Sequence, residues 1–413
     1  MRLFKTISVI GLGYIGLPTA TMFASRKINV HGVDVNQQTV DTINAGGIHI
    51  VEPDLDMVVK AAVKEGYLRA SLEAMPADAF LIAVPTPFKN DHEPDLSYIQ
   101  SAAEKIAPVL QQGNLVILES TSPVGATEQL AEWLSSARPD LSFPHQVGES
   151  ADINVAHCPE RVLPGQVMRE LVENDRIIGG MTARCSARCI ELYSTFVRGA
   201  CVQTDARTAE MAKLTENSFR DVNIAFANEL SILCDQFKID VWELINLANR
   251  HPRVNILQPG TGVGGHCIAV DPWFIVHAGG ENARIIRSAR EINDYKTEWV
   301  VEKVQTAAAE FEDKNKRRPV VACMGLAFKP NIDDLRESPA LEVFHALLQS
   351  GLDVLAVEPN LESHSSIVLT DPKRGAAEAD IVAFLVAHKG FAELKVNGLQ
   401  LDFCGVRRDG TDQ

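Results

Sequence analysis

The chain has 413 residues, of which 46% are hydrophobic and 23% are charged, a composition typical of globular proteins. Its length predicts two or three domains, because a single core rarely grows beyond about 250–300 residues. The 39 Lys and Arg residues against 54 Asp and Glu residues give a net charge of −15, which argues against a main task in binding nucleic acid or an anionic membrane. A phosphate-bearing small molecule is not excluded, since it needs only a local patch of cations and amides.

The first half of the chain alternates short runs of aliphatic and β-branched residues with helix-length segments. We expect strands at residues 6–10, 30–33, 79–84, 115–119 and 152–156. This rhythm predicts an α/β fold in which helices cover both faces of a parallel sheet.

A glycine-rich turn follows the first expected strand and opens a helix. Its three glycines are spaced so that the backbone can present amide N–H groups to a pyrophosphate at the positive end of that helix. Asp34 ends the second strand, where a carboxylate accepts hydrogen bonds from ribose hydroxyls and repels a 2′-phosphate. We therefore expect a Rossmann domain that binds NAD rather than NADP. The residues expected to bind the cofactor here are Gly11, Gly13, Tyr14, Ile15, Gly16 and Asp34.

Two later strands each end in a turn that contains threonine. In an open α/β sheet the ligand crevice lies at the carboxyl ends of the strands, so these turns are expected to face the ligands. We expect Thr86 and Thr127 to contact the cofactor, and Thr121 lies in the same crevice. A helix cap is the alternative role for each threonine.

Strand signals stop near residue 208, and helical periodicity replaces them up to about residue 248. Apolar side chains at positions 211, 214, 222, 226 and 230 predict one long helix. Lys213, Asn217 and Arg220 fall at i, i+4 and i+7 and so share another stripe of it. Taken alone, such a stripe is typical of a solvated surface.

A second glycine-rich turn, at residues 261–272, carries the thiol of Cys267. A thiolate can add to an aldehyde and leave a carbon that still carries a hydride, so a thiol together with a nicotinamide site indicates oxidation to an acid through a thioester. A thiol of pKa ~8.5 needs a nearby cation or helix end to ionise at neutral pH, and His266 and Lys213 are candidates. A buried structural cysteine is the alternative interpretation.

A charged segment at residues 312–319 predicts a turn, after which strands are expected at 320–324, 354–358 and 381–386. The chain thus reads as two α/β domains joined by a helical middle. We place the three domains at residues 1–203, 204–306 and 307–413, with the cysteine turn in the second.

The eight cysteines lack the paired spacing of a zinc site, so we expect no metal and reduced thiols, as in the cytosol. The amino terminus enters a strand without the pattern of a signal peptide. No apolar run approaches the ~20 residues of a membrane span. These features predict a cytoplasmic protein with no nucleic-acid partner and no membrane insertion.

Five ordered motifs resemble the UDP-glucose/GDP-mannose dehydrogenase family over essentially the whole chain. They are the first glycine turn, Cys-Pro-Glu-Arg at 158–161, the helix with Lys213 and Asn217, Gly-Gly-His-Cys at 264–267, and residues 325–338. The resemblance implies NAD as cofactor, a Rossmann-like C-terminal domain that binds the UDP-sugar, and a homodimer built on the long helix. Segments 158–165, 249–255 and 264–273 are most similar to members that oxidise UDP-N-acetyl-D-mannosamine for enterobacterial common antigen.

The resemblance also implies catalytic roles. Cys267 matches the nucleophile, Lys213 the proton shuttle that stabilises each alkoxide, and Asn217 a donor to the same oxygen. Asp271 matches an acid that, together with Thr121, positions water for proton transfer.

Glu160 matches the first of two family glutamates near the reacting carbon, and Pro164 replaces the second, which leaves the hydrolytic base unassigned. Arg253 is expected to come from the neighbouring subunit, where a guanidinium suits a sugar or carboxylate held by two hydrogen bonds. Arg336 is expected to reach the cofactor. The implied substrate-binding residues are Arg161, Val162, Lys213, Asn217, Arg220, His251, Arg253, Gly264, Phe328 and Lys329.

These observations favour the four-electron oxidation of UDP-N-acetyl-D-mannosamine to its uronate. The same chemistry on UDP-N-acetylglucosamine, UDP-glucose or GDP-mannose is an alternative, because residue spacing does not reveal a sugar configuration. A two-electron β-hydroxyacid dehydrogenase would explain Lys213 and Asn217 but leaves Cys267 and the C-terminal domain without a task. A catalytically silent NAD-binding regulator would explain only the first glycine turn.

Overall fold

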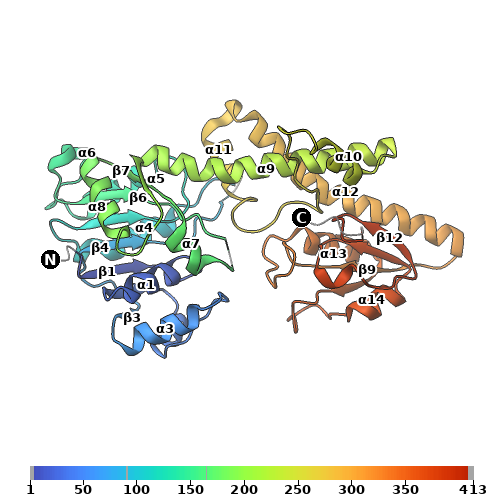
Figure 1. Ribbon diagram of the computed structural model, residues 1–413, viewed down its shortest axis with the longest axis horizontal. Coiled ribbons are helices and arrows are strands. Elements are labelled where there is room, and N and C mark those ends of the chain that lie inside the picture. Colours follow the sequence, from blue (N-terminus) through green and yellow to red (C-terminus); the bar gives the residue numbers. More distant parts are fainter. Residues whose placement is uncertain (1–3, 90–91, 164, 408–413) are drawn as a thin grey trace. The chain divides into compact units, whose positions relative to one another are not determined.

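The computed structural model describes residues 4–89, 92–163 and 165–407. The chain forms two compact units, Met1–Thr215 and Glu216–Gln413 (Figure 1). Within the described ranges, no helix combines the length and apolar character needed to cross a membrane.

The first unit is built on an eight-stranded sheet of order β3-β2-β1-β4-β5-β6-β7-β8. The expected parallel pairing is confirmed from β3 to β6, whereas β7 is antiparallel to β6 and parallel to β8. The sequence did not predict β3, β7 or β8. The strands are β1 (Thr6–Ile10), β2 (Asn29–Val33), β3 (Leu68–Ser71), β4 (Ala79–Ile82), β5 (Leu115–Leu118), β6 (Asn154–His157), β7 (Arg176–Gly180) and β8 (Cys201–Asp205).

Helices cover both faces of this sheet, as expected, because alternate strand side chains point to opposite sides. Ile7 and Val9 of β1 join a buried cluster with Phe23, whereas Phe80 of β4 joins a separate cluster with Leu130. Each cluster supplies the core of one layer. The helices are α1 (Gly16–Ser25), α2 (Gln37–Asn44), α3 (Leu55–Lys64), α4 (Ser97–Ile106), α5 (Ala126–Ala137), α6 (Pro144–Val147), α7 (Val167–Glu173) and α8 (Ala183–Tyr193).

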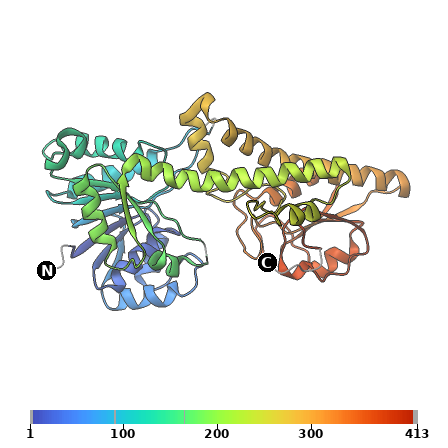
Figure 2. The ribbon, with the colours of Figure 1, turned by 45° about the horizontal axis from the view of Figure 1, so that its top comes forward.

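The expected long helix is α9 (Ala206–Phe237), which Figure 2 shows as one unbroken yellow-green helix. It is followed by α10 (Val241–Ala248), α11 (Asp271–Gly279) and α12 (Arg284–Asn315). The turn expected at 312–319 begins late, because α12 continues to Asn315 and ends where Lys316 adopts a left-handed conformation with φ 55. The domain boundary placed at 306/307 therefore falls inside a helix.

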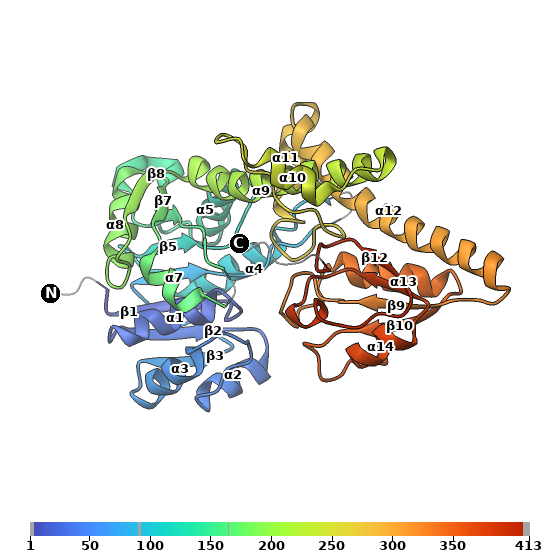
Figure 3. The same cartoon turned by 45° about the vertical axis from the view of Figure 1, so that its right-hand side comes forward.

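The second unit ends in a four-stranded parallel sheet of order β10-β9-β11-β12. Val321 and Cys323 of β9 pack in the same cluster as residues of α12 and α13, while Ala322 and Met324 pack on the opposite face with Ala376 of α14 (Figure 3). The elements are β9 (Val320–Met324), α13 (Pro339–Gln349), β10 (Asp353–Val357), α14 (Pro372–Glu378), β11 (Ile381–Phe384) and β12 (Leu399–Asp402).

This sheet repeats the nucleotide-binding layout of the first unit. Gly325 has φ 92 and donates its N–H to Val357 O at 2.8 Å, and Leu326 N donates to Glu358 Oε2 at 2.8 Å. A glycine turn after one strand thus meets an acid at the end of its neighbour, as happens around Gly11. The expected Rossmann-like C-terminal domain is confirmed.

Candidate active site

The residues expected in the active site belong to both units of the chain. The glycine turn, the three threonines, Glu160 and Lys213 lie in the first unit, and Asn217, Cys267 and Asp271 lie in the second. Because α9 runs across the division, Lys213 and Asn217 lie one helical turn apart on it.

The first glycine turn can be formed by glycine alone at two of its positions. A Cβ on Gly11 would lie 2.4 Å from Ala83 O, and one on Gly16 would lie 1.8 Å from Gly11 O. A Cβ on Gly13 would meet nothing within 4 Å, so the backbone there is open to a ligand. This is the shape that a pyrophosphate needs at the start of α1.

The groups around this turn fit a dinucleotide. Asp34 Oδ2 accepts from Leu12 N at 2.9 Å and Oδ1 accepts from Asn36 N at 2.9 Å, which leaves further lone pairs for ribose hydroxyls. Thr86 Oγ1 is buried and has no hydrogen-bond partner among the residues described, as expected for a hydroxyl that awaits a ligand. Tyr14 is 42% exposed beside the same turn.

Thr127 does not fit its expected role. Its side chain is fully buried, and its hydroxyl donates to Glu210 Oε1 at 2.6 Å. Glu210 also accepts from Gly125 N at 2.7 Å, so it caps the start of α5 from α9. Thr127 therefore links α5 to α9 through Glu210, and its hydroxyl donates its hydrogen bond within the protein. Thr121 is half-buried directly after β5.

Glu160 is held in place by hydrogen bonds to both carboxylate oxygens. Oε2 accepts from Arg176 Nη2 at 2.9 Å, and Oε1 accepts from Arg161 N at 2.6 Å. The Arg161 guanidinium donates to Asp175 O at 3.1 Å, and Val162 packs partly buried against the core. A cavity of about 10 Å³ borders Glu160 and Arg176, at the lower limit of what one water occupies.

Pro164 lies outside the described residues. Arg176 had no expected role, because nothing in the local sequence around it indicates that its partner is a carboxylate in the loop after β6.

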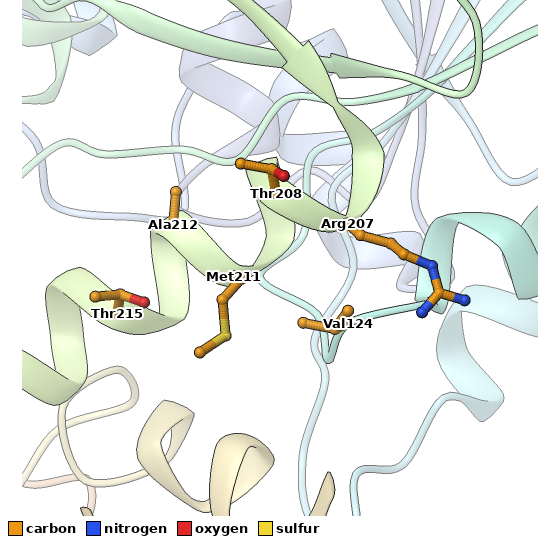
Figure 4. Close-up of a pocket in the computed structure, with 6 residues that line it drawn as sticks. All are labelled: Val124, Arg207, Thr208, Met211, Ala212 and Thr215. Carbon is orange, nitrogen blue, oxygen red and sulfur yellow. The ribbon is translucent and has the colours of Figure 1, made fainter. Parts of the chain in front are cut away.

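Beside the start of α9 the surface forms a hollow that the sequence did not indicate. Its volume is about 630 Å³. Figure 4 shows Arg207 at one side of it and Met211 beside Val124. Met211, one of the apolar positions that predicted the long helix, is 39% exposed there. The hollow is lined by Val124, Arg207, Thr208, Met211, Ala212 and Thr215, and by none of the expected site residues.

Cys267 lies in the turn that leads into α11 and its side chain is exposed. Its carbonyl accepts from Val270 N at 3.1 Å and from Asp271 N at 2.8 Å, so the turn continues directly into the helix. The positive end of α11 is therefore close to the thiol in sequence and in space. A helix N-terminus favours the thiolate form of a cysteine.

Asn217 and Asp271, two residues with separate expected roles, are brought together by the fold of the second unit. The Asn217 Nδ2 donates to Asp271 Oδ2, and both side chains are buried. An amide nitrogen has two N–H groups, so a second donor is available for a substrate oxygen. Cys267, Asp271 and Asn217 thus form one connected set within the second unit.

The cysteine turn packs against the loop that follows β9. A Cβ on Gly264 would lie 2.2 Å from Glu337 O, and a Cβ on Gly265, with φ 83, would lie 2.9 Å from Phe328 Cε2. Only glycine allows this approach. The loop expected to contact the nucleotide and the turn that carries Cys267 are therefore in direct contact.

His266 is not a good candidate for a cation beside the thiol. Desolvation by its surroundings and the Arg336 guanidinium lower the pKa of His266, although Asp334 and Glu337 oppose this. At neutral pH the imidazole is consequently more neutral than an ordinary histidine. Within the second unit, the N-terminal end of α11 is the better candidate for stabilising a thiolate at Cys267.

The remaining expected residues are on the surface of the second unit. Arg336 forms an ion pair with Asp334 at 2.6 Å, and Lys329 is exposed on the same loop. Arg253 N donates to His251 Nδ1 at 3.4 Å. The side chains of Arg220, His251 and Arg253 are exposed in the single chain.

The chain matches all three domains of the UDP-glucose/GDP-mannose dehydrogenase family. The NAD binding domain matches residues 5–197, the central domain residues 207–295 and the UDP binding domain residues 322–403.

Individual relatives match over nearly their full length. An NDP-N-acetyl-D-galactosaminuronic acid dehydrogenase of Ralstonia nicotianae is 65% identical over 402 residues, covering 96% of this chain and 94% of the relative. A UDP-N-acetyl-D-mannosamine dehydrogenase of Escherichia coli is 64% identical over 398 residues, covering 94% of each. The solved structure of a UDP-D-ManNAc dehydrogenase from Pyrococcus horikoshii matches with a TM-score of 0.86 and 37% identity, covering 98% of this chain and 96% of that one.

Proposed function

This chain belongs to the UDP-glucose/GDP-mannose dehydrogenase family, and from that membership we propose that it oxidises UDP-N-acetyl-D-mannosamine to UDP-N-acetyl-D-mannosaminuronate with two NAD. The observation that carries the proposal is the connected set of Cys267, Asp271 and Asn217. The thiol lies at the entrance to α11, and the first residue of that helix is bonded to an amide on α9. A two-electron dehydrogenase has no use for such a thiol.

The chain's own residues account for the steps between the two oxidations. NAD, when bound, accepts one hydride from the primary-alcohol carbon in each oxidation. Lys213 and Asn217 are spaced to stabilise the alkoxide oxygen of the reacting group. Cys267 Sγ forms a bond to the aldehyde carbon, and the second oxidation leaves a thioester. Water then adds to the thioester carbonyl, the C–S bond breaks, and the carboxylate and thiolate are released.

Proton transfer to and from water is assigned to Asp271 with Thr121, with Glu160 close to the reacting carbon. This assignment is supported by the burial of both carboxyl groups and by their hydrogen bonds to Asn217 and Arg176.

The sugar is assigned from the relatives named for UDP-N-acetyl-D-mannosamine. A second candidate is the corresponding N-acetylgalactosamine nucleotide, because the Ralstonia relative is equally similar to this chain. Both sugars carry an acetamido group, and they differ in configuration at C2, which bears that group, and at C4, which bears a hydroxyl. Recognition of that configuration depends on pocket shape, so kinetics must decide between them.

The test is a kinetic comparison of nucleotide sugars with the purified enzyme and NAD. We expect the highest kcat/KM with UDP-N-acetyl-D-mannosamine and the formation of two NADH per sugar. The panel also contains UDP-N-acetyl-D-galactosamine, UDP-N-acetylglucosamine, UDP-glucose and GDP-mannose, and a higher kcat/KM for any of them would reassign the substrate. One NADH per sugar, with a free aldehyde or ketone accumulating, would contradict the thioester mechanism.

We further propose that the enzyme is a homodimer assembled on α9. Phe219, Phe226 and Leu233 recur every seven residues and are 69%, 50% and 38% exposed, and Phe237 continues the row at 63%. An exposed apolar row of this kind is typical of a helix that packs on a partner. A second copy of the chain would bury it.

Two further proposals concern the location of the enzyme and the use of its product. We place the enzyme in the cytosol, where thiols stay reduced without disulfide pairing. Its uronate product would serve the synthesis of surface polysaccharide such as the enterobacterial common antigen.

A further inference from the structure

We propose that Arg176 is a positioning residue that holds Glu160 for catalysis, and that it can do so because the neighbouring carboxyl group of Glu119 carries a proton. The proposal rests on the proposed function, in which Glu160 lies near the reacting carbon. All the groups involved belong to the first unit.

Arg176 begins β7 and is 4% exposed. Its Nη2 donates to Glu160 Oε2 at 2.9 Å, and its Nη1 lies 3.6 Å from Glu119 Oε1. The guanidinium also lies over the ring of Tyr193, 4.6 Å from its centroid. One buried cation therefore faces two buried carboxyl groups, and it can balance the charge of only one.

The hydrogen bonds indicate which of the two carboxyl groups is paired with the Arg176 guanidinium. Glu160 accepts at both oxygens, from Arg176 and from Arg161 N at 2.6 Å. Glu119 Oε1 accepts from Tyr193 Oη at 3.0 Å, whereas its Oε2 is buried without a partner in the described part of the chain. An ionised group with an unsatisfied buried oxygen is costly, so Glu160 is the carboxylate and Glu119 the neutral acid.

The electrostatic surroundings agree with this assignment. Burial raises the pKa of Glu119 to about 8 despite the opposing charge of Arg176, and Glu160 and Cys158 add to the rise. The titratable groups that face Glu119 are Arg176 on β7, Cys158 and Glu160 after β6, and Tyr193 on α8; α1 contributes the uncharged Thr19.

The arrangement has a consequence for activity at alkaline pH. Below a pH of about 8 Glu119 is neutral, and the positive charge of Arg176 is balanced by Glu160. Above that pH Glu119 becomes an anion and competes for the same guanidinium. The hydrogen bond between Arg176 and Glu160 then weakens. The catalytic steps that need Glu160 in its position become slower.

The first experiment compares the pH dependence of kcat for the wild type and Glu119→Gln. Glutamine copies the shape of the neutral acid, so we expect a kcat within about twofold of wild type at pH 7. Because glutamine cannot ionise, the ratio of variant to wild-type kcat should rise as the pH passes 8. Using the ratio removes the contribution of groups that titrate in both proteins, such as Cys267.

Two variants serve as controls for this measurement. Glu104→Gln, at an exposed position on α4, should give a constant ratio over the same range. Cys158→Ser tests the other acidic group beside Arg176: its thiol pKa is lowered by a hydrogen bond with Cys189 and by the Arg176 charge, although burial opposes this. A constant ratio for Cys158→Ser, with a rising ratio for Glu119→Gln, assigns the effect to Glu119.

A second variant tests Arg176 directly. Arg176→Lys keeps a positive charge but loses the planar fork that reaches both carboxyl groups, so kcat should fall about tenfold or more with little change in the KM for NAD. Infrared spectroscopy gives a readout that does not depend on activity. The band of a buried protonated carboxyl group should be lost as the wild type passes pH 8, and should be missing at all pH values from Glu119→Gln.

The outcomes separate this inference from the proposed function. A Glu119→Gln ratio that stays constant from pH 6.5 to 9.5, or wild-type kcat in Arg176→Lys, would overturn the inference while leaving the oxidation of nucleotide sugars established. A wild-type enzyme that oxidises none of the nucleotide sugars would instead overturn the proposed function, and the infrared measurement would still test the protonation of Glu119.

Discussion

Asp34 makes two backbone hydrogen bonds inside the protein, to Leu12 N and Asn36 N, at the point where the ribose of NAD is expected. Replacing it with alanine removes both the ribose acceptor and the charge that repels a 2′-phosphate. We expect Asp34→Ala to raise the KM for NAD about tenfold, as for the loss of a charged hydrogen bond, and to relax the preference against NADP. Steady-state constants for both cofactors measure this.

Asp34→Asn tests the effect of the negative charge on cofactor preference separately from the effect of the turn's structure. Asparagine retains one oxygen for Leu12 N and loses the acceptor for Asn36 N, so it keeps one of the two hydrogen bonds of the turn while the repulsion of NADP disappears. Both variants should therefore shift towards NADP, and Asp34→Ala should also lose more thermal stability. An unchanged ratio of kcat/KM for the two cofactors in both variants would show that another residue selects NAD.

The residues for which the sequence predicts a role are those that belong to a short motif. Cys267 and Asp34 are recognisable because the neighbouring glycines or strand define their setting. Thr127 was assigned to the cofactor, yet it bonds to Glu210, 83 positions away. Arg176 was overlooked for the same reason: its partners meet it only after the sheet has formed.

At the scale of elements, the contact between the cysteine turn and the loop after β9 leads to a prediction about Gly264. A methyl group there would lie 2.2 Å from Glu337 O and 2.7 Å from Pro339 Cδ, so backbone has to move. We expect Gly264→Ala to lower the free energy of unfolding by about 1–3 kcal/mol, as in other overpacked sites, and to lower kcat through displacement of Cys267. Thermal unfolding and steady-state kinetics measure the two effects.

Gly260→Ala is the matched control, because it adds the same methyl group directly before the same turn. Its nearest neighbour would be Gly262 O at 3.8 Å, which is ordinary contact. This variant should resemble the wild type in both measurements. If Gly264→Ala proved as stable and active as Gly260→Ala, the two loops would not be coupled as the structure indicates.

Strands could be predicted from the sequence where nearly all of their residues are apolar and buried. The strands expected at 6–10 and 320–324 coincide with β1 and β9, which are apolar runs with helices on both sides. β8 and β12 lie at the edges of their sheets, where polar and exposed residues interrupt the apolar pattern. β7 begins with Arg176 and ends in two glycines, so its sequence did not indicate a strand either.

At the scale of the whole molecule, the central helix α9 shows what the periodicity of apolar residues cannot predict. The apolar positions on α9 predicted a helix correctly, but Met211 and Phe226 are exposed rather than covered by the chain's own core. Periodicity identifies an apolar face without identifying what covers it. The proposed second copy gives that face a partner, and the expected role of Arg253 requires it to reach the site of the neighbouring subunit.

Subunit complementation tests this assembly. Arg253→Ala and Cys267→Ala should each be inactive as pure dimers, the first for lack of the substrate-binding guanidinium and the second for lack of the nucleophile. If Arg253 acts across the interface, a hybrid dimer has one site with both wild-type residues, because a two-fold interface pairs each site with the other chain. Random exchange of equal amounts should then restore about a quarter of wild-type activity, since half of the dimers are hybrids with one working site.

The control is a mixture of Cys267→Ala with Asn217→Ala, whose altered residues belong to the same connected set in one subunit. No hybrid of these two chains contains an intact site, so that mixture should stay inactive under the same conditions. Mass spectrometry of the intact dimers establishes that exchange has occurred. Verified hybrids of Arg253→Ala and Cys267→Ala without activity would mean that Arg253 serves the site of its own chain, since in that case every site in the hybrid lacks either the guanidinium or the thiol.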